Sequence, residues 1–424
     1  MKFGGRLGAL QEPRFRLLWL GQTASAIGDS LIYVALPFAV LQIGGGAAEI
    51  GLVAAAYTLA RAVFIVVGGV WADRLPRRLV MLTCDAIRAG VDAFIAIALL
   101  TGAMEVWMFV ITATLFGAAQ AFFVPASVGL VPATVSEGRL QQANALLQLS
   151  HGATSIFGPA IAGAVIAFSE PGWVFAADAA SFVVSAAFLA RLKVRPHEPE
   201  PRQPFLAELR DGAREALSHG WLRAGFVAAA VANVGIGTLF VLGPLIADEE
   251  LGGAAAWGLI LTGGAVGGLL GSVVAIRVQP RRPVPVALIA WSFGALPLLA
   301  LAPPLPVLVI AAANGVFALG IIYGNAIWET LQQREIPPAR LSRVNAFDWM
   351  VSLIFMPIGQ AVAGPLSESV GTDAVLVGAA LLIFVPCLAT LPARGVRHGP
   401  TLVSSGVSGS AGGSHAPAPP DRLP

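Results

Sequence analysis

The chain repeats one pattern of residues: RLQQANALLQLSHGATSIFGPAIAG at 139–163 returns as RLSRVNAFDWMVSLIFMPIGQAVAG at 340–364. A shift of 201 positions brings eight residues of the first stretch onto identical residues of the second. A weaker echo, shifted by 203 positions, pairs ADRLPRR at 72–78 with AIRVQPR at 275–281. Repeats in the same order along a chain indicate two structurally similar halves joined in tandem.

Composition places both halves in a membrane. Of the 424 residues, 56% are hydrophobic and 12% are charged, and the mean hydropathy is +0.78. A soluble core could not bury this much apolar surface, so lipid must surround most of the chain. Twelve runs approach the roughly 20 apolar residues that a membrane-spanning helix needs. They lie at 16–43, 49–71, 79–101, 106–133, 141–168, 173–191, 222–246, 255–276, 284–301, 306–330, 341–367 and 373–392. The sequence therefore predicts an all-α membrane protein with twelve transmembrane helices in two pseudo-symmetric six-helix halves.

The charges of the loops predict the orientation. The loops after the odd-numbered spans contain no Lys or Arg, whereas the loops on the other side carry nearly all of the basic residues. Basic loops stay in the cytoplasm. We therefore expect a multi-pass protein of the inner (cytoplasmic) membrane with both termini in the cytoplasm.

Five segments follow from these runs. The chain divides into a cytoplasmic N-terminus (1–14), an N-terminal half (15–191), a cytoplasmic linker (192–221), a C-terminal half (222–392) and a tail (393–424). The linker ends in a pattern typical of an amphipathic helix, which we expect to lie along the membrane surface. The tail is rich in Gly, Ser, Ala and Pro without periodicity, which predicts disorder.

Several motifs resemble one known family. GGVWADRLPRR at 68–78 resembles the signature that the major facilitator superfamily carries between its second and third spans, with Trp71 and Pro76 as departures. SIFGPAIAG at 155–163 resembles the fifth-helix motif of antiporters, with Gly158, Pro159 and Gly163 in its key positions. With FFVPA at 122–126 and other stretches, the chain is similar over 15–392 to the branch of macrolide-efflux and enterobactin-exporter-like proteins.

The resemblance implies a major facilitator fold, alternating access and a gating cluster around the 68–78 motif. By this reading, charges near the tight turn latch the two halves together. We assign the cluster to Gly69, Asp73, Arg74, Arg77, Arg78, Asp85 and Arg88, and place the last two at the foot of the third span.

Charged side chains inside spans are costly, so each one is a candidate for function. Asp29, Arg61 and Asp92 come to similar depths when counted along their helices. Arg61 needs an acidic partner, for which Asp29 and Asp92 are available. Burial disfavours a charged carboxylate and a nearby arginine favours it, so Asp29 can exchange a proton; a purely structural salt bridge is the alternative. Gln22 adds a polar partner on the same face as Asp29. For Asp178 we expect a bond across a helix interface rather than a role in coupling.

Polar residues of the second half are further candidates. Asn233 and Asp348 could contribute to a coupling or substrate site, while Glu329 is expected at the membrane interface in a salt bridge with Arg334 or Arg343. Apolar and aromatic residues would line most of the cavity, which suits an amphipathic substrate. These aromatic residues are Phe38, Phe64, Phe116, Phe240 and Trp349; ordinary helix packing is the alternative for each.

Other function classes are disfavoured. The net charge of +2 does not suggest a nucleic-acid partner, and Cys84 and Cys387 lack metal-ligand spacing, so we expect free thiols and no metal. No Walker-type glycine loop or assembled catalytic constellation is visible, so we expect neither an enzyme nor a cofactor. The sequence predicts a monomeric, proton-coupled exporter of small amphipathic molecules such as drugs, antibiotics or siderophores. An importer of a small solute and a non-transporting membrane sensor are the alternatives.

Overall fold

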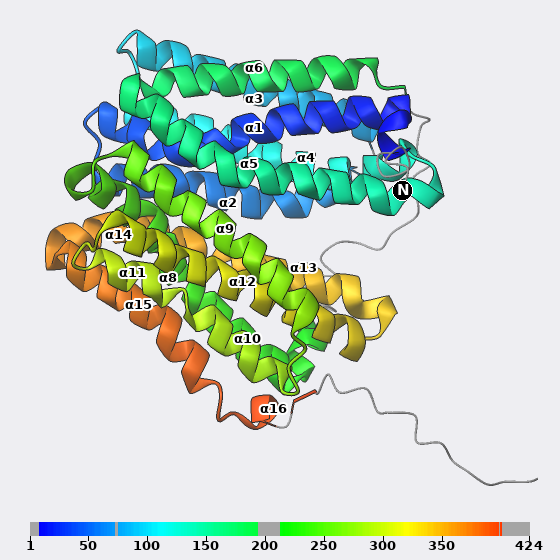
Figure 1. Cartoon of the computed structure of the whole chain (residues 1–424), viewed down its shortest axis with the longest axis vertical. Helices are drawn as coiled ribbons and strands as arrows, with labels where there is room; N and C mark the ends of the chain where they lie inside the picture. The colour runs from blue at the N-terminus through cyan, green and yellow to red at the C-terminus, as the bar shows by residue number, and fades with distance from the viewer. Residues whose placement is uncertain (1–7, 73–74, 194–212, 398, 401–424) are drawn as a thin grey trace, which may run out of the picture.

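A computed structural model describes residues 8–72, 75–193, 213–397 and 399–400. Helices form the architecture throughout these residues, and they fall into two bodies (Figure 1). The first body follows a short 3-10 helix at Gly8–Gln11. Its helices are α1 (Pro13–Gln42), α2 (Ala47–Ala72), α3 (Arg77–Leu100), α4 (Val106–Leu130), α5 (Leu140–Phe168) and α6 (Pro171–Arg191).

The second body has the same plan with two interrupted spans. Its helices are α8 (Gly220–Glu250), α9 (Ala254–Arg277), α10 (Pro283–Ser292), α11 (Ala295–Leu301), α12 (Val307–Glu335), α13 (Pro338–Ile354), α14 (Met356–Val370) and α15 (Thr372–Ala389), followed by the short α16 (Arg394–Arg397). The predicted ninth span breaks at residues 293–294 and the eleventh at Phe355. In both, a proline follows the break within the first turns of the next helix, where its missing N–H costs little.

Ten helical segments of the described residues are long and apolar enough to cross a membrane. The helix α3 carries too many charged residues to be among them. The eleventh span is divided into α13 and α14, and neither is long enough alone. The all-α membrane fold is thus confirmed, while the count of twelve spans stays a prediction. The predicted linker helix lies mostly outside the described residues, of which 213–218 are helical.

The two bodies meet at one end and diverge toward the other, where the N-terminus lies (Figure 1). At the meeting end, α5 packs along α9 and α14 packs along α2. Glycines bring these backbones together: a Cβ on Gly163 would lie 2.6 Å from the Ala254 carbonyl oxygen, and a Cβ on Gly364 would collide with the Ala48 backbone. Gly163 and Gly364 are equivalent positions of the internal repeat, so the two contacts are related by the same pseudo-symmetry.

The repeat also governs ion pairs at the diverging end. Arg139, which precedes α5, lies 3.4 Å from Glu12, which precedes α1. Its repeat partner Arg340 pairs in the same way with Glu215, shortly before α8. The Ser136 hydroxyl donates to Glu12 at 2.7 Å and holds the pKa of that carboxyl below its usual range. Each half therefore fastens the start of its fifth span to the start of its first.

Candidate functional site

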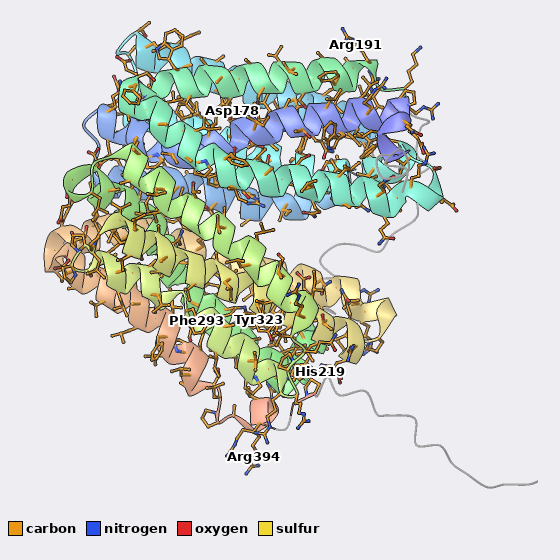
Figure 2. The ribbon with its side chains drawn as sticks, viewed as in Figure 1. Asp178, Arg191, His219, Phe293, Tyr323 and Arg394 are labelled. Atoms are coloured by element: carbon orange, nitrogen blue, oxygen red, sulfur yellow. The ribbon has the colours of Figure 1, made fainter. Side chains whose placement is uncertain are left out.

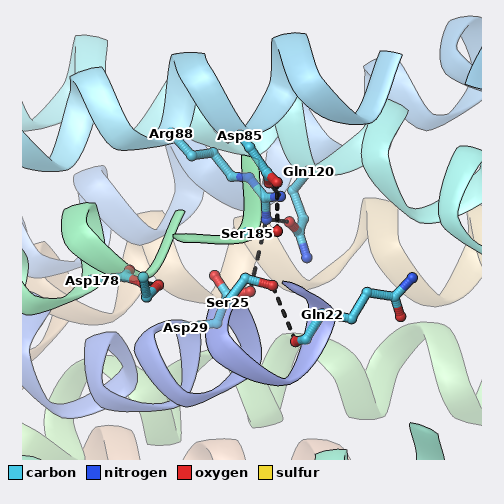
Figure 3. A network of polar contacts seen from close by, with 9 residues as sticks. Gln22, Ser25, Asp29, Asp85, Arg88, Gln120, Asp178 and Ser185 are labelled. Atoms are coloured by element: carbon cyan, nitrogen blue, oxygen red, sulfur yellow. Dashed lines mark hydrogen bonds and ion pairs between the residues drawn. The ribbon is translucent and has the colours of Figure 1, made fainter. Parts of the chain in front are cut away.

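A fully buried arginine organises the interior of the first half. Arg88 lies on α3, about 16 Å along the helix from Arg77 by the usual rise per residue. Its guanidinium donates to Asp85 at 2.5 Å and to Gln120 of α4 at 2.8 Å (Figure 3). Ser185 of α6 donates to the other oxygen of Asp85 at 2.7 Å. The bonds tie α3 to α4 and α6 through buried charge.

Aromatic rings enclose this guanidinium. It lies 4.1 Å from the ring centre of Phe123 and 4.3 Å from that of Phe182. A cation over aromatic faces is stabilised by the negative face of the ring, and more strongly so where water is excluded. Arginine suits such a site because its planar group stacks and donates at the same time. The expected position of Asp85 and Arg88 at the foot of the third span is therefore wrong: both side chains are fully buried in the helix bundle.

Asp29 reaches this network from α1. Its carboxylate lies 3.7 Å from the Arg88 guanidinium, and 29% of its side-chain surface is exposed (Figure 3). The sequence pointed to Arg61 as the ion partner, but the structure gives that place to Arg88. Arg61 acts on Asp29 only at longer range, and its Nε has no hydrogen-bond partner. Gln22 is buried two helical turns before Asp29 on α1. Its backbone carbonyl accepts a hydrogen bond from the Ser25 hydroxyl at 3.1 Å.

Two further acids lie side by side within the same half. Asp92 of α3 and Asp178 of α6 are 1% and 0% exposed, and their carboxyl groups are within hydrogen-bonding reach of each other. Asp178 lies deep along α6, well away from Arg191 at the end of that helix (Figure 2). The Ser181 hydroxyl donates to Asp178 at 3.0 Å. Asp178 is thus in a helix contact, as expected, but with an acid as its neighbour.

Two arginines of the gating cluster, Arg77 and Arg78, bind backbone carbonyls of neighbouring helices. Arg77 donates to the Gly129 carbonyl at the end of α4 at 2.5 Å, and Arg78 donates to the Leu189 carbonyl at the end of α6 at 2.8 Å. These bonds stay within the first half and join the start of α3 to the ends of α4 and α6. Gly69 lies in α2, and Asp73 and Arg74 lie outside the described residues. A latch between the halves stays a prediction.

The fifth-helix motif lies in a sandwich between α1 and α9. A Cβ on Gly158 would collide with Ser30 of α1, while the Pro159 carbonyl lies where a Cβ on Gly258 of α9 would stand. Thr262 of α9 also donates to the carbonyl of Ile156 at 3.2 Å. The motif therefore sets the distance between the two halves at their meeting end.

The second-half candidates do not gather into one site. Asn233 donates within its own helix to the Ala229 carbonyl at 2.9 Å. Asp348 accepts from the Trp328 indole at 2.9 Å and from Gln332 at 2.7 Å, which fastens α13 to α12. Glu329 is exposed on α12, and its predicted salt bridge stays a prediction.

The predicted aromatic lining is divided among several environments. Phe38 is 6% exposed and belongs to the packed core, whereas Phe116 packs edge-on against Phe182, next to Arg88. Phe64 is 37% exposed and stacks obliquely near Phe122. Ordinary helix packing, the alternative to lining a cavity, therefore accounts for Phe38 and Phe116.

Sequence reasoning missed Arg88 as the centre of the network, together with Gln120 and Ser185. The depth of Arg88 along α3 was a usable signal. Gln120 and Ser185 carried none, since polar uncharged residues are common in membrane helices.

With this geometry in place, comparison with known proteins identifies the family. A profile described as Major Facilitator Superfamily matches residues 18–356. The chain belongs to the major facilitator superfamily. Among relatives of this superfamily, the multidrug efflux pump Tap of Mycobacterium tuberculosis is 26% identical over 401 residues, which cover 91% of this chain and 94% of Tap. Macrolide efflux protein A of Streptococcus pyogenes is 23% identical over 383 residues, covering 85% and 91%. Both fit the predicted branch.

Solved structures of other transporters share the fold. The nucleoside transporter NupG superimposes with a TM-score of 0.71 at 15% identity, covering 89% of this chain and 98% of NupG. A bacterial homolog of the human lysosomal transporter Spinster, in an inward-facing and unoccupied conformation, gives 0.66 at 15% identity, covering 94% and 98%. At these identities the likeness concerns the fold alone.

Proposed function

We propose that this protein is a proton-driven exporter that moves small amphipathic molecules out of the cell by alternating access. Membership of the superfamily and relatives named as efflux proteins support the class of activity. The observation that carries the coupling part is the partly exposed Asp29 beside the buried Arg88. An acid that reaches both solvent and a buried cation can take up a proton and change the balance of charge inside the bundle.

The surroundings of Asp29 favour access from water. Tyr33 lies one turn further along the same face of α1 and is 63% exposed. A carboxylate is costly in hydrocarbon, so a face of α1 that combines Asp29 and Tyr33 belongs at a water-filled opening between the halves. The halves diverge at the end that carries the basic loops, which we assign to the cytoplasm. The conformation described here is then open to the cytoplasm.

Coupling follows if protonation and substrate binding favour different conformations. A proton on Asp29 removes the attraction between Asp29 and Arg88, which alters how α1 and α3 hold together. A ligand shifts a conformational equilibrium only through such differences in binding free energy between states. Export results when substrate enters from the cytoplasm and proton entry from outside resets the carrier.

The test is transport in proteoliposomes with matched amounts of protein and erythromycin as the macrolide probe. The parent should move erythromycin against its concentration gradient when a pH gradient drives protons in the opposite direction across the membrane. Asp29→Asn should lose this uphill movement. Asp373→Asn, which changes an exposed acid at the meeting end, is the matched control and should behave as the parent. Uphill transport by Asp29→Asn at the parental rate would refute the assignment, and accumulation in the direction of proton flow would favour an importer.

A further inference from the structure

The neighbouring carboxyl groups of Asp92 and Asp178 have no role in the account given so far. We propose that these two residues share one proton as a carboxyl–carboxylate pair, and that this pair is a second proton-binding site of the transporter. The transport role of the pair rests on the proposed proton-driven function. The shared proton itself does not, and it can be tested separately.

Burial and hydrogen bonding argue for the shared proton. Both residues are almost fully buried, and their carboxyl groups are hydrogen-bond neighbours. If both were charged, the Oδ2 atoms of both would lack any donor. Two buried carboxylates at this range repel each other, and each would also bear the cost of an unsatisfied polar atom. One proton supplies the missing donor and turns the repulsion into a hydrogen bond.

A count of charges in the network leads to the same conclusion. The acids that face one another here are Asp29 from α1, Asp85 and Asp92 from α3, and Asp178 from α6. Arg88 is the cation among them, and Asp85 and Asp29 are its ion partners. Among the described residues, neither member of the pair forms an ion pair of its own.

Two cations act on this group of acids, and Arg88 acts directly on Asp92 as well as on Asp29. Arg61 of α2 acts on Asp29, and α4 contributes the neutral Gln120 to Arg88. Four acids against two cations leave an excess of negative charge in a buried place, which protons must reduce. Asp29 acts electrostatically on both members of the pair, so a change of charge at Asp29 is felt there.

The packing of α1 against α6 makes room for the pair. A Cβ on Gly28 would collide with Oδ1 of Asp178 and would lie 2.9 Å from its Cγ. The Asp178 carboxyl therefore lies against bare backbone of α1, where only glycine leaves space. The Ser181 hydroxyl, which donates to Oδ1, also lies against Gly28 and would collide with the same Cβ. Because Gly28 directly precedes Asp29, a movement of α1 displaces Asp29 and at the same time changes the packing around Asp178.

Infrared spectroscopy of the purified full-length protein tests the shared proton directly. At neutral pH the parent should show a protonated-carboxyl band that shifts in D2O. Asp92→Asn and Asp178→Asn should each remove or shift that band, because a shared proton needs both partners. Asp373→Asn should leave it unchanged. Absence of the band in the parent, or an unchanged band in either pair variant, would overturn the proposal.

A glycine variant keeps the test decisive if an Asn variant fails to fold. Gly28→Ala should alter the same band by pushing Asp178 away from Asp92. Gly90→Ala on α3 is its matched control, since a Cβ there meets nothing within 4 Å. An unchanged band in a folded Gly28→Ala protein would count against the pair.

Transport measurements then separate the two proposals. With the erythromycin assay, Asp178→Asn should lower pH-driven accumulation to the level reached without a gradient. If the parent itself ignores the gradient, the proton-driven function fails while the infrared result still decides the pair. If Asp178→Asn accumulates erythromycin as the parent does, the pair has no transport role and Asp29 alone carries the coupling.

Discussion

Replacing Gly163 by alanine should shift the protein away from the conformation described here. The added Cβ would lie 2.6 Å from the Ala254 carbonyl oxygen, whereas ordinary contacts begin at 3.4 Å. The obstacle is helix backbone, so α5 and α9 must separate by about 1 Å, or the carbonyl must tilt. Overpacking of this kind costs about 1–3 kcal/mol. The conformation in which this end has opened bears none of that cost.

The shift in population follows from this free energy. A difference of 1–3 kcal/mol corresponds to roughly 5- to 150-fold in the ratio of the two conformations. Gly364→Ala should act in the same direction through α14 and α2, since its Cβ would collide with the Ala48 backbone. The two sites lie on different helix pairs, so the free-energy costs in the double variant should approximately add.

Pulsed EPR distances between spin labels on Ser169 and Asp373 report this shift. Both residues are exposed at the meeting end, one in each half, whereas Cys84 and Cys387 are buried. The longer distance should gain population in Gly163→Ala.

Glycines in open space provide the matched controls. Gly152→Ala on α5 and Gly378→Ala on α15 place a Cβ where nothing lies within 4 Å, so both should give the parental distribution. If Gly163→Ala also gave that distribution, close backbone packing would not limit the equilibrium, and the reasoning would be refuted.

Three further outcomes follow from the structure. Cysteines at Ser169 and Asp373 should react with an impermeant reagent in intact cells while one at Gly138 should not; reversed labelling would contradict the orientation. Arg88→Met should lower the free energy of unfolding by about 3–5 kcal/mol, because it leaves a buried acid without its ion partner. Thermal unfolding in detergent measures this, and a midpoint equal to that of the parent would contradict it. Asp348→Asn keeps an acceptor and should unfold near the parental temperature, whereas Asp348→Leu leaves two donors unpaired and should lose about 1–3 kcal/mol for each.

Much of the architecture could be predicted because it is written in local patterns. The repeat shared by 139–163 and 340–364 indicated two halves, and the apolar runs located the helices. Both interrupted spans carry a proline just after the break, Pro297 in the ninth and Pro357 in the eleventh. Neither break could be predicted from the sequence, because each apolar run continues through it.

The site was harder to predict because its contacts join distant parts of the chain. The sequence showed that Asp29 and Asp92 are intramembrane acids and that an arginine must balance them. It pointed to Arg61, whereas the structure has Arg88 beside Asp29, because the choice depends on which faces α1, α2 and α3 present to one another. The neighbour of Asp92 on α6 could not be predicted either: spacing along one helix says nothing about the rotation of another.

The two ion pairs at the diverging end, Arg139 with Glu12 and Arg340 with Glu215, bear on how each half can move. Arg139 fastens the start of α5 to the start of α1, and Arg340 fastens the start of α13 to the segment before α8. The far ends of the same two spans form the contacts between the halves. Each of these spans is therefore held to its own half by an ion pair at one end and packs against the opposite half at the other. In the first half, α5 is one continuous helix, so a displacement at Gly163 can be transmitted along it to the start of α1. In the second half, the break at Phe355 separates Gly364 from Arg340, so the two halves differ in how rigidly they join these two ends.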